Sequence, residues 1–487
     1  MNRPFDEAKY KRLLDGLEIT EIELSVLEES RRLDAEYYQR KFLKMEHVLS
    51  CLPNQSLGML GSFLTGPFGS EFNVENYISD AIYRYVRGKD VKPFFLKDDD
   101  NVYIPEADFK RLSKYSLHLG DILVSVVGTL GNASIVTEST SSAIFSCKST
   151  VFHSKAINPF YLIAYLNCSY GHSLLLRKTR GTVQAGINIE DLSSLLVFTP
   201  SNQLQINIEA LIHSSFEKLK QSKALYAEAE NLLLDELGLH DWQPSAEQIA
   251  VKTFQQSFLQ TGRLDAEYYQ PKYDELLKRL AALTNGNAWK LCSLGSMSDP
   301  LHYGSSTKLE YINQGVPFLR IADVNQYRFD PESLKYISPA AAASEASATV
   351  RTADMIISRS GTLGLAVVIT PELSGSVFGS YFIRVRLNTS NLTPDYLALY
   401  MNAMVGRMQV EQANTGGIQT NLTIPVIESL QIAIPPISLQ NLLVDKVNES
   451  FRTQDESKHL LNVAKRGVEM AIEQDEATAM EWMNAQT

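Results

Sequence analysis

The sequence predicts an α/β (α+β) fold in which two related globular domains are separated by two long antiparallel helices that pair like a coiled coil. The octapeptide Arg-Leu-Asp-Ala-Glu-Tyr-Tyr-Gln occurs at 32–39 and again at 263–270, so the chain contains an internal duplication. Each copy ends in a stretch with seven-residue apolar spacing, which is typical of a long paired helix. Short β-type runs mixed with short apolar helices precede each of these stretches, and they indicate a mixed globule.

The duplication and the changes in composition predict seven segments along the chain. In order, they are a polar, acidic and partly helical N-terminal segment, the first globular domain, the central long helix, a linker, the second globular domain, the C-terminal long helix and a tail. We expect their boundaries at 1–31, 32–200, 201–240, 241–262, 263–437, 438–475 and 476–487.

Further matches between the two copies fall on one alignment with small loop insertions. They pair Gly128-Thr129-Leu130-Gly131 with Gly361-Thr362-Leu363-Gly364, Tyr165-Leu166-Asn167 with Tyr400-Met401-Asn402, and Gln184, Pro200 and Gln205 with Gln419, Pro435 and Gln440. Between these anchors the copies diverge, as a comparison of 92–118 with 325–350 shows. A shared frame with divergent loops predicts two sites of one kind that recognise different targets.

The long helices are predicted over 203–237 and 439–473. Their matched apolar seam consists of Ile212, Leu219, Tyr226 and Leu233 in the first helix and Val447, Leu461 and Val468 in the second, with a polar interruption at 453–458. Ser201 is the candidate N-cap and Gly238 the candidate stop of the first helix. Helices of this length span about 50 Å and need a partner, for which the simplest choice is each other. Two unrelated surface helices are the alternative, which the matched seam disfavours.

Each globular domain is expected to contain short strands and one short apolar helix. The strand candidates are Ile122–Val127, Leu195–Thr199, Met355–Ser358 and Leu430–Ile434, and the helix candidates are Pro159–Leu166 and Pro394–Met401. Gly-rich turns join them, as in other mixed folds.

The net charge of −11 is unevenly distributed. Residues 40–200 hold 16 Lys and Arg against 14 Asp and Glu, and residues 271–436 hold 13 of each, so the remainder of the chain carries −13. Acidity therefore belongs to the connecting framework, and the two globular domains are neutral to slightly basic. This balance permits DNA binding through local basic patches without requiring it.

Targeting signals and membrane spans are not expected. No apolar stretch approaches the roughly 18–20 residues of a membrane span, and no signal peptide follows Met1. The four cysteines (Cys51, Cys147, Cys168 and Cys292) lack metal-type spacing, so we expect reduced, mostly buried thiols in a cytoplasmic protein.

The repeated, ordered motifs resemble the specificity subunit of type I restriction–modification systems over about residues 20–475. The resemblance depends on the octapeptide, on the Gly-Thr-Leu-Gly turn, on Gly181-Thr182-Val183-Gln184 and Gly416-Gly417-Ile418-Gln419, and on the strand that enters each long helix, as in Ile434-Pro435-Pro436-Ile437-Ser438-Leu439-Gln440. The first copy departs slightly, with Phe198-Thr199-Pro200-Ser201-Asn202 in place of the two-proline form.

The resemblance implies two target recognition domains that each read one half of a split, asymmetric site in double-stranded DNA. It implies that the conserved helices separate these domains and dock two methyltransferase subunits, and that restriction subunits join the assembled complex. Two readers on a rigid spacer would read half-sites at a fixed separation.

Candidate DNA contacts are polar and basic residues of the domain loops. In the first domain they are Arg87, Lys89, Lys92, Arg180, Thr182 and Gln184; in the second they are Tyr303, Ser305, Ser306, Lys308, Arg320, Asn325, Arg359, Ser360 and Gln419. Any single one of these basic residues can instead be a solvated surface charge. Arg87 aligns with Arg320 and Asp90 with Asp323, so a structural ion pair common to the fold is an alternative. Gln184 and Gln419 also align, which favours a role in the scaffold.

The octapeptide is expected to be structural and to form the same partner-docking surface twice. The residues assigned to docking are Arg32, Leu33, Asp34, Glu36, Tyr37 and Tyr38, and their counterparts Arg263, Leu264, Asp265, Glu267, Tyr268 and Tyr269. Leu33 and the tyrosines are expected to bury, and the carboxylates to cap or pair. A catalytic pair formed by Asp34 and Glu36 is disfavoured, because it would have to serve twice.

No catalytic motif is complete. Asn158-Pro159-Phe160-Tyr161 is the nearest approach to an amino-methyltransferase loop, but it lacks the second proline, and its counterpart Leu392-Thr393-Pro394-Asp395 keeps only the first. There is no Walker-type motif, and the eight histidines show no metal-ligand spacing. The chain is therefore predicted to be non-enzymatic and without a bound metal, with S-adenosylmethionine, ATP and Mg²⁺ on partner subunits. A stand-alone methyltransferase or nuclease, and a protein scaffold that does not bind DNA, are the alternatives.

Overall fold

The computed structural model describes residues 6–67, 71–78, 82–98, 100–181, 185–247, 249–286, 288–414 and 421–486. They form two compact units: unit 1 contains Met1–Leu219 and Asp455–Thr487, and unit 2 contains Lys220–Gln454. The unit boundary divides both long helices, α9 (Asn202–Glu236) and α16 (Ile437–Glu473), so each unit contains a part of both.

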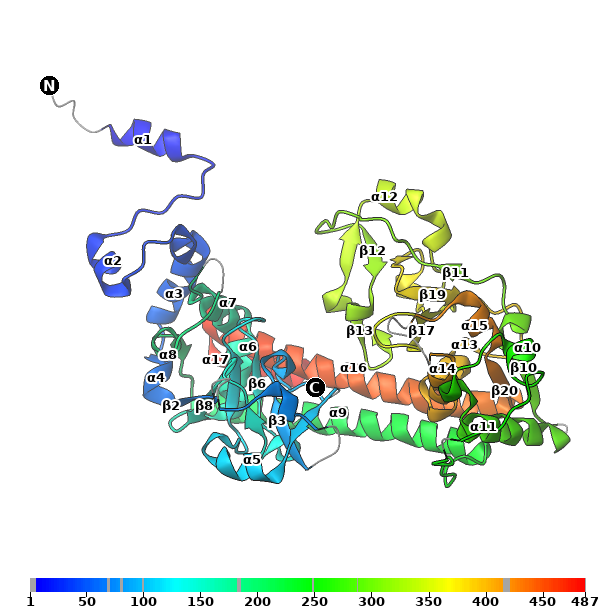
Figure 1. The fold of residues 1–487 in the computed structure, drawn as a ribbon. Helices are drawn as coiled ribbons and strands as arrows, with labels where there is room; N and C mark the ends of the chain where they lie inside the picture. The colour runs from blue at the N-terminus through cyan, green and yellow to red at the C-terminus, as the bar shows by residue number, and fades with distance from the viewer. Residues whose placement is uncertain are drawn as a thin grey trace. The chain divides into compact units, whose positions relative to one another are not determined.

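Unit 1 is built on an antiparallel sheet with the strand order β2-β8-β5-β6 (Figure 1). Its strands are β2 (Gly61–Thr65), β8 (Ser149–Ser154), β5 (Ile122–Ser125) and β6 (Ala133–Ile135). A second sheet has the order β4-β3-β7, and a separate pair is formed by β1 and β9. These strands are β4 (Val102–Ile104), β3 (Tyr83–Val86), β7 (Ile144–Phe145), β1 (Asn54–Ser56) and β9 (Leu196–Phe198).

Unit 2 repeats this topology strand for strand. Its four-stranded sheet has the order β11-β19-β16-β17, its three-stranded sheet β15-β12-β18, and its separate pair β10-β20. The strands are β11 (His302–Tyr303), β19 (Phe382–Val385), β16 (Met355–Ser358), β17 (Ala366–Val368), β15 (Lys335–Ile337), β12 (Val316–Leu319), β18 (Val377–Phe378), β10 (Lys290–Ser293) and β20 (Gln431–Ile434). The parallel pairing of β3 with β7 recurs as that of β12 with β18. The predicted duplication is therefore a duplication of fold.

Unit 2 also contains a hairpin of β13 (Val324–Asn325) and β14 (Arg328–Phe329). The two turn residues, Gln326 and Tyr327, have φ values of 46° and 65°. Two left-handed residues in succession define the tight turn whose twist matches that of paired strands. The hairpin spans Val324–Phe329, at the start of the divergent stretch 325–350.

A helix pair covers the sheet of each unit. In unit 1 it consists of α6 (Pro159–Asn167) and α7 (Ser169–Arg177), and in unit 2 of α13 (Pro394–Asn402) and α14 (Met404–Ala413). The hydroxyls of Tyr161 and Tyr396 donate to the carbonyl oxygens of Phe198 and Ala433, at 2.9 and 2.7 Å. These buried hydrogen bonds hold each apolar helix to the strand that leads into a long helix.

Shorter helices complete the two units. In unit 1 they are α1 (Glu7–Leu14), α2 (Leu24–Ser30), α3 (Arg40–Ser50), α4 (Leu57–Leu60), α5 (Glu106–Arg111), α8 (Ile189–Ser193) and α17 (Glu476–Gln486). In unit 2 they are α10 (Phe258–Thr261), α11 (Pro271–Ala282), α12 (Pro339–Ser344) and α15 (Ile424–Ser429). No helix among the described residues combines the length and the apolar character needed to cross a bilayer.

The long helices pair antiparallel within each unit. In unit 1 the hydroxyl oxygens of Ser215 and Ser457 lie 2.9 Å apart, and Lys218 is 2.6 Å from Glu456. In unit 2 the hydroxyl oxygens of Ser222 and Ser450 lie 3.2 Å apart, and Lys446 is 3.1 Å from Glu228. In both units, residues further along α9 contact residues earlier in α16, which confirms the predicted antiparallel pairing.

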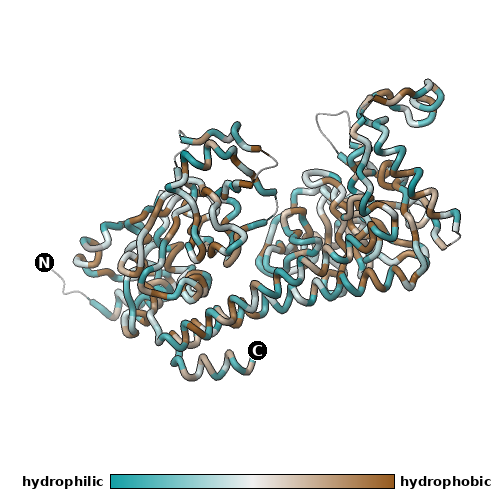
Figure 2. Tube along the Cα trace, turned by 90° about the horizontal axis from the view of Figure 1, so that it is seen from below, coloured by the Kyte–Doolittle hydropathy of each residue, from teal (hydrophilic) through white to brown (hydrophobic). Residues whose placement is uncertain are grey.

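The helix seam is more polar than the heptad pattern predicts, because it buries Ser215, Ser222, Ser450 and Ser457. Figure 2 shows hydrophobic and hydrophilic residues interspersed along the long-helix region. Five predicted seam residues are buried: Ile212, Leu233, Val447, Leu461 and Val468. Leu219 is only half-buried, and Tyr226 stacks on Tyr327 of the β13–β14 turn at 4.7 Å between ring centroids. Three residues of the predicted polar interruption at 453–458 are buried, namely Thr453, Gln454 and Ser457.

Two further expectations differ from the structure. Only Cys168 is buried, whereas Cys51 is exposed and Cys147 and Cys292 are intermediate, so the prediction of mostly buried thiols is wrong. Residues expected as a tail form α17, which buries Ala479 and Met483. Gly467 of α16 permits this contact, because a Cβ there would lie 2.2 Å from the Met483 sulfur.

Candidate nucleic-acid and partner interface

Both copies of the octapeptide adopt the same compact turn. The Arg32 guanidinium donates to the two carboxylate oxygens of Asp34 at 2.9 and 2.6 Å, and Arg263 donates to those of Asp265 at 2.8 and 2.6 Å. The two tyrosine rings of each copy meet edge to face at 5.0 Å, at interplanar angles of 82° and 80°. The sequence identity therefore specifies identical local geometry.

Each turn is held to its own unit by the arginine and the tyrosines. Arg32 donates to the carbonyl oxygens of Lys178 and Thr179 at 3.3 and 2.7 Å, just beyond α7. Arg263 donates to the carbonyl oxygen of Ala413 at 3.0 Å, at the end of α14. Because bidentate arginine pairs fix orientation as well as charge, these contacts make the turn rigid.

The first copy is the more deeply buried. Arg32, Tyr37 and Tyr38 are buried, whereas Arg263 and its neighbouring tyrosines are half-buried. The bidentate hydrogen bonds from Arg32 hold the pKa of Asp34 below its usual range. In the paired copy, hydrogen bonding to Asp265 likewise raises the pKa of Arg263.

The leucine of each octapeptide lies on the surface, which corrects the expectation that Leu33 buries. Leu33 is 89% exposed and Leu264 is 67% exposed. The arginine and tyrosine turn inward, so the residue between arginine and aspartate is left pointing outward. The Glu36 and Glu267 side chains are also exposed. Each rigid turn therefore presents the same leucine and glutamate to solvent, a repeated surface of the kind that the docking prediction requires.

The Gly-Thr-Leu-Gly turns are also built alike. Ser125 donates from its hydroxyl to the carbonyl oxygen of Thr129, and Ser358 does the same to Thr362. The first and last glycines have positive φ in both copies, from 76° to 88°, which a side chain would strain. At the ends of the β5–β6 and β16–β17 hairpins the first two residues of each turn are exposed and the last glycine is buried. This rigid frame positions the residues that adjoin the turns.

Apart from Arg87, the candidate DNA contacts of unit 1 fall into three groups. Lys89 and Lys92 are exposed, and Lys89 pairs with Asp100 at 3.0 Å. The Arg180 guanidinium donates hydrogen bonds to both carboxylate oxygens of Asp191 at 2.5 and 2.9 Å, and the Arg180 side chain is 44% exposed. Thr182 and Gln184 lie outside the described residues.

Arg87 and Arg320 occupy one structural position in the two units. Arg87 forms bidentate bonds with Asp90 at 2.9 Å each, and Arg320 binds Asp323 in the same way. Both aspartates are buried and accept the main-chain N–H of the arginine as well. This geometry favours the alternative of a structural ion pair over a direct contact with a base.

In unit 2 the structure brings three candidates together. The Arg359 guanidinium lies 4.7 Å from the centre of the Tyr303 ring, and the adjacent Ser360 donates to the side chain of Asn421. The Tyr303 hydroxyl accepts the main-chain N–H of Ile424 at 3.2 Å. Sequence reasoning missed Asn421 and Ile424, because no motif links them to Ser360 and Tyr303, which lie 61 and 121 positions away in the chain.

Of the other candidates of unit 2, Ser305, Ser306 and Lys308 follow Tyr303 on the same loop. Ser306, Lys308 and Asn325 are exposed, Ser305 is buried, and Gln419 lies outside the described residues. Gly304 determines the path of the 303–308 loop, because a Cβ there would lie 2.2 Å from the Gly379 carbonyl oxygen.

The segment Asn158-Pro159-Phe160-Tyr161, which partly matches a methyltransferase motif, forms the start of α6. Asn158 caps α6 by accepting the main-chain N–H groups of Phe160 and Tyr161 at 2.8 and 3.2 Å. Its amide nitrogen also donates to Glu209 at 2.7 Å. The asparagine side chain is thus occupied in capping the helix, as the expectation of a helix start at this position implied.

Comparisons with known proteins identify part of this architecture. Residues 289–466 match the family model described as the type I restriction modification DNA specificity domain, which confirms the resemblance noted in the sequence. No curated protein matches the chain.

Similar solved structures include two specificity proteins. One is the type I restriction–modification S subunit from M. genitalium, with 13% identity and a TM-score of 0.39, covering 86% of this chain and 94% of that one. Another is the HsdS subunit from Thermoanaerobacter tengcongensis, with 15% identity and a TM-score of 0.28, covering 87% of this chain and 96% of that one.

Proposed function

We propose that this chain, which carries a type I restriction modification DNA specificity domain at 289–466, is the DNA-recognition subunit of a type I restriction–modification complex. Unit 1 reads one half of a bipartite, asymmetric DNA site, and unit 2 reads the other. The observation that carries the proposal is the duplicated fold, in which strand order and octapeptide turns repeat while the loops between them differ.

Loop chemistry supports a reading function. Tyr303 and Arg359 form a planar aromatic and guanidinium surface at one loop cluster of unit 2, and Lys89 and Lys92 supply exposed positive charge in unit 1. Arginine reads guanine through two hydrogen bonds, and lysine neutralises phosphate. Because the loop sequences of the two units diverge, as between 92–118 and 325–350, the two half-sites differ in sequence.

The long helices and octapeptides serve the assembly. The helices set the number of unread base pairs between half-sites, since helix length grows by about 1.5 Å per residue and B-DNA by about 3.4 Å per base pair. The exposed Leu33 and Leu264 each contribute to the docking of one methyltransferase subunit. Restriction subunits join through that assembly, and S-adenosylmethionine, ATP and Mg²⁺ bind to the partners.

The experiment is to map methylated positions in DNA from cells that carry the chain together with its methyltransferase partner. The expected result is a split asymmetric site. Arg359→Ala should relax one half-site by about 1–3 kcal/mol, and the matched Lys89→Ala should weaken binding without changing the base preference of either half-site.

Two outcomes would replace the proposal. Methyl transfer from labelled S-adenosylmethionine by the purified chain alone would identify a stand-alone methyltransferase. Absence of salt-dependent binding to mixed-sequence duplex, by the complex as well as by the chain, would identify a protein scaffold.

A further inference from the structure

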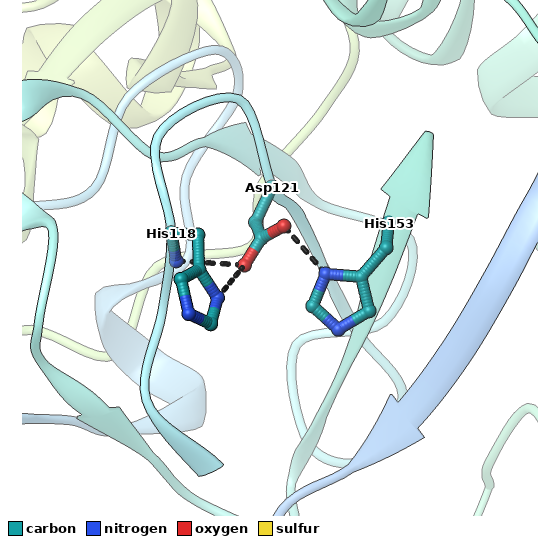
Figure 3. A group of neighbouring side chains, drawn as sticks. All are labelled: His118, Asp121 and His153. Atoms are coloured by element: carbon teal, nitrogen blue, oxygen red, sulfur yellow. Dashed lines mark hydrogen bonds and ion pairs between the residues drawn. The ribbon is translucent and has the colours of Figure 1, made fainter. Parts of the chain in front are cut away.

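Two of the eight histidines, which look scattered in the sequence, meet in unit 1 around one buried carboxylate (Figure 3). The Asp121 side chain lies between His118 and His153, and its Oδ1 is 2.6 Å from His153 Nδ1 while its Oδ2 is 3.6 Å from His118 Nδ1. One potential ligand atom from each residue lies within 4.8 Å of the others. The sequence concealed this group because its members are brought together by strand pairing and not by short spacing.

The scaffold under this group is rigid. Asp121 directly precedes β5 and His153 is on β8, and these two strands pair with Ile122 opposite Phe152. Asp121 Oδ2 also accepts the main-chain N–H of His118 at 2.8 Å, which fixes the turn. The His118 side chain is 74% exposed and that of Asp121 only 6%. One ligand is thus held in place and another is free to rotate toward it.

Unit 2 shows what the same position looks like without histidine. At a constant offset of 233 residues, His118, Asp121 and His153 correspond to Arg351, Asp354 and Arg386. Arg386 makes bidentate bonds of 2.7 Å with Asp354, and the main-chain N–H of Arg351 donates to the same carboxylate at 2.8 Å. A permanent cation therefore satisfies the structural need at this position, and arginine has no lone pair to offer a metal.

We propose that His118, Asp121 and His153 form a binding site for a divalent transition metal of the zinc class. Two imidazoles and one carboxylate are a ligand set that zinc and its neighbours favour, whereas Mg²⁺ and Ca²⁺ prefer oxygen ligands. Metal bonds of about 2.0–2.1 Å place tetrahedral ligand atoms about 3.4 Å apart. The Asp121 Oδ1–His153 Nδ1 distance of 2.6 Å is shorter than this, so the metal would replace that hydrogen bond and the two atoms would move apart. His118 Nδ1 is already 3.6 Å from Asp121 Oδ2, and the exposed His118 ring can rotate toward the metal.

The bound metal would act as a staple between the turn before β5 and strand β8. It would replace, in unit 1, the charge neutralisation that Arg386 provides in unit 2.

The test uses the tag-free full chain titrated with Zn²⁺ by calorimetry, and with Co²⁺ by visible absorption. One equivalent is expected to bind the wild-type chain. His153→Arg restores the arginine–aspartate pair of unit 2 and should keep the fold while weakening Zn²⁺ binding at least about tenfold. His118→Gln should weaken binding comparably, whereas His47→Gln, at an exposed position elsewhere in unit 1, is the matched control and should bind like the wild type.

A thermal readout separates the site from incidental surface binding. Zn²⁺ should raise the melting temperature of the wild-type and His47→Gln chains and leave that of His153→Arg unchanged. Absence of Zn²⁺ binding by the wild-type chain, or equal binding by wild type and His153→Arg, would overturn the proposal.

Discussion

The two units agree where side chains bond to the main chain and differ where side chains face solvent. The octapeptide pairs, the Gly-Thr-Leu-Gly turns and the tyrosine bonds of α6 and α13 recur with bond lengths within a few tenths of an ångström. The β13–β14 hairpin corresponds in unit 1 to a turn with an isolated bridge between Val91 and Leu96, whose residues differ in sequence. Arg359 of the Tyr303–Arg359 cluster stands where unit 1 has Val126. The frame is therefore conserved by internal hydrogen bonding, which leaves the loops free to diverge.

At the junctions α6–α7 and α13–α14 a glycine packs directly against main-chain atoms, and the packing is tighter in unit 1 than in unit 2. Substituting these glycines should give the largest loss of stability. A Cβ on Gly171 would lie 1.9 Å from the Tyr165 carbonyl oxygen, and one on Gly406 would lie 2.5 Å from main-chain atoms of Met401. Gly171→Ala should destabilise unit 1 by about 3 kcal/mol or more and Gly406→Ala should destabilise unit 2 by about 2 kcal/mol, because backbone cannot move aside. Chemical denaturation measures the loss, and hydrogen exchange in α7 and α14 localises it.

Gly286→Ala is the matched control for these two substitutions. Nothing lies within 4 Å of a Cβ there, so the change should stay within about 0.5 kcal/mol. Equal, small effects of all three substitutions would show that the α6–α7 and α13–α14 junctions are looser than described.

The exposed leucines of the two octapeptides allow a test of whether both copies dock a methyltransferase subunit. Leu33→Asp and Leu264→Asp should each remove one methyltransferase subunit from the complex and leave the fold intact. Burying one leucine contributes about 1.5–3 kcal/mol, so each docking affinity should fall by about tenfold to a hundredfold. Native mass spectrometry of the co-expressed complex counts the bound subunits.

Met59→Asp, at another exposed apolar side chain of unit 1, controls for surface charge. If both leucine variants retain two methyltransferase subunits, the octapeptides are structural only. If one leucine variant loses both subunits, docking is cooperative and not independent at the two copies.

The sequence predicted the duplication, both long helices and four of the strands (β5, β9, β16 and β20), because periodicity and repeated anchors are local signals. It did not predict the Ser215–Ser457 and Ser222–Ser450 contacts, since a search for apolar heptads passes over serines that pack between helices. It also placed Leu33 inside, because hydrophobicity alone does not reveal which way a short turn faces. Such features depend on tertiary pairing, which one sequence does not encode in its spacing.

The candidate site was predictable to a lesser extent. Pairing of Arg87 with Asp90 was foreseen as an alternative, because the same spacing recurs in Arg320 and Asp323. The cluster of Tyr303 and Arg359 joins residues 56 positions apart through β-sheet topology, and no motif indicated it. The His118–Asp121–His153 group was missed for the same reason.

The smallest expected effect concerns pH and compares the two arginine–aspartate pairs. The folded pKa of Asp34 is depressed by Arg32, so the pair stabilises the protein above the ordinary aspartate pKa of about 4. This contribution is lost as pH falls through the lowered folded value.

Asp34→Asn should therefore lower the free energy of unfolding at pH 7 by less than about 1 kcal/mol, since the pair is partly exposed, and by progressively less below pH 4. Asp265→Asn is the matched substitution in unit 2, where the same two bonds are made. Denaturation of both variants and the wild type across the acid range measures the differences, and a pH-independent Asp34→Asn difference would mean that Arg32 acts through its carbonyl contacts alone.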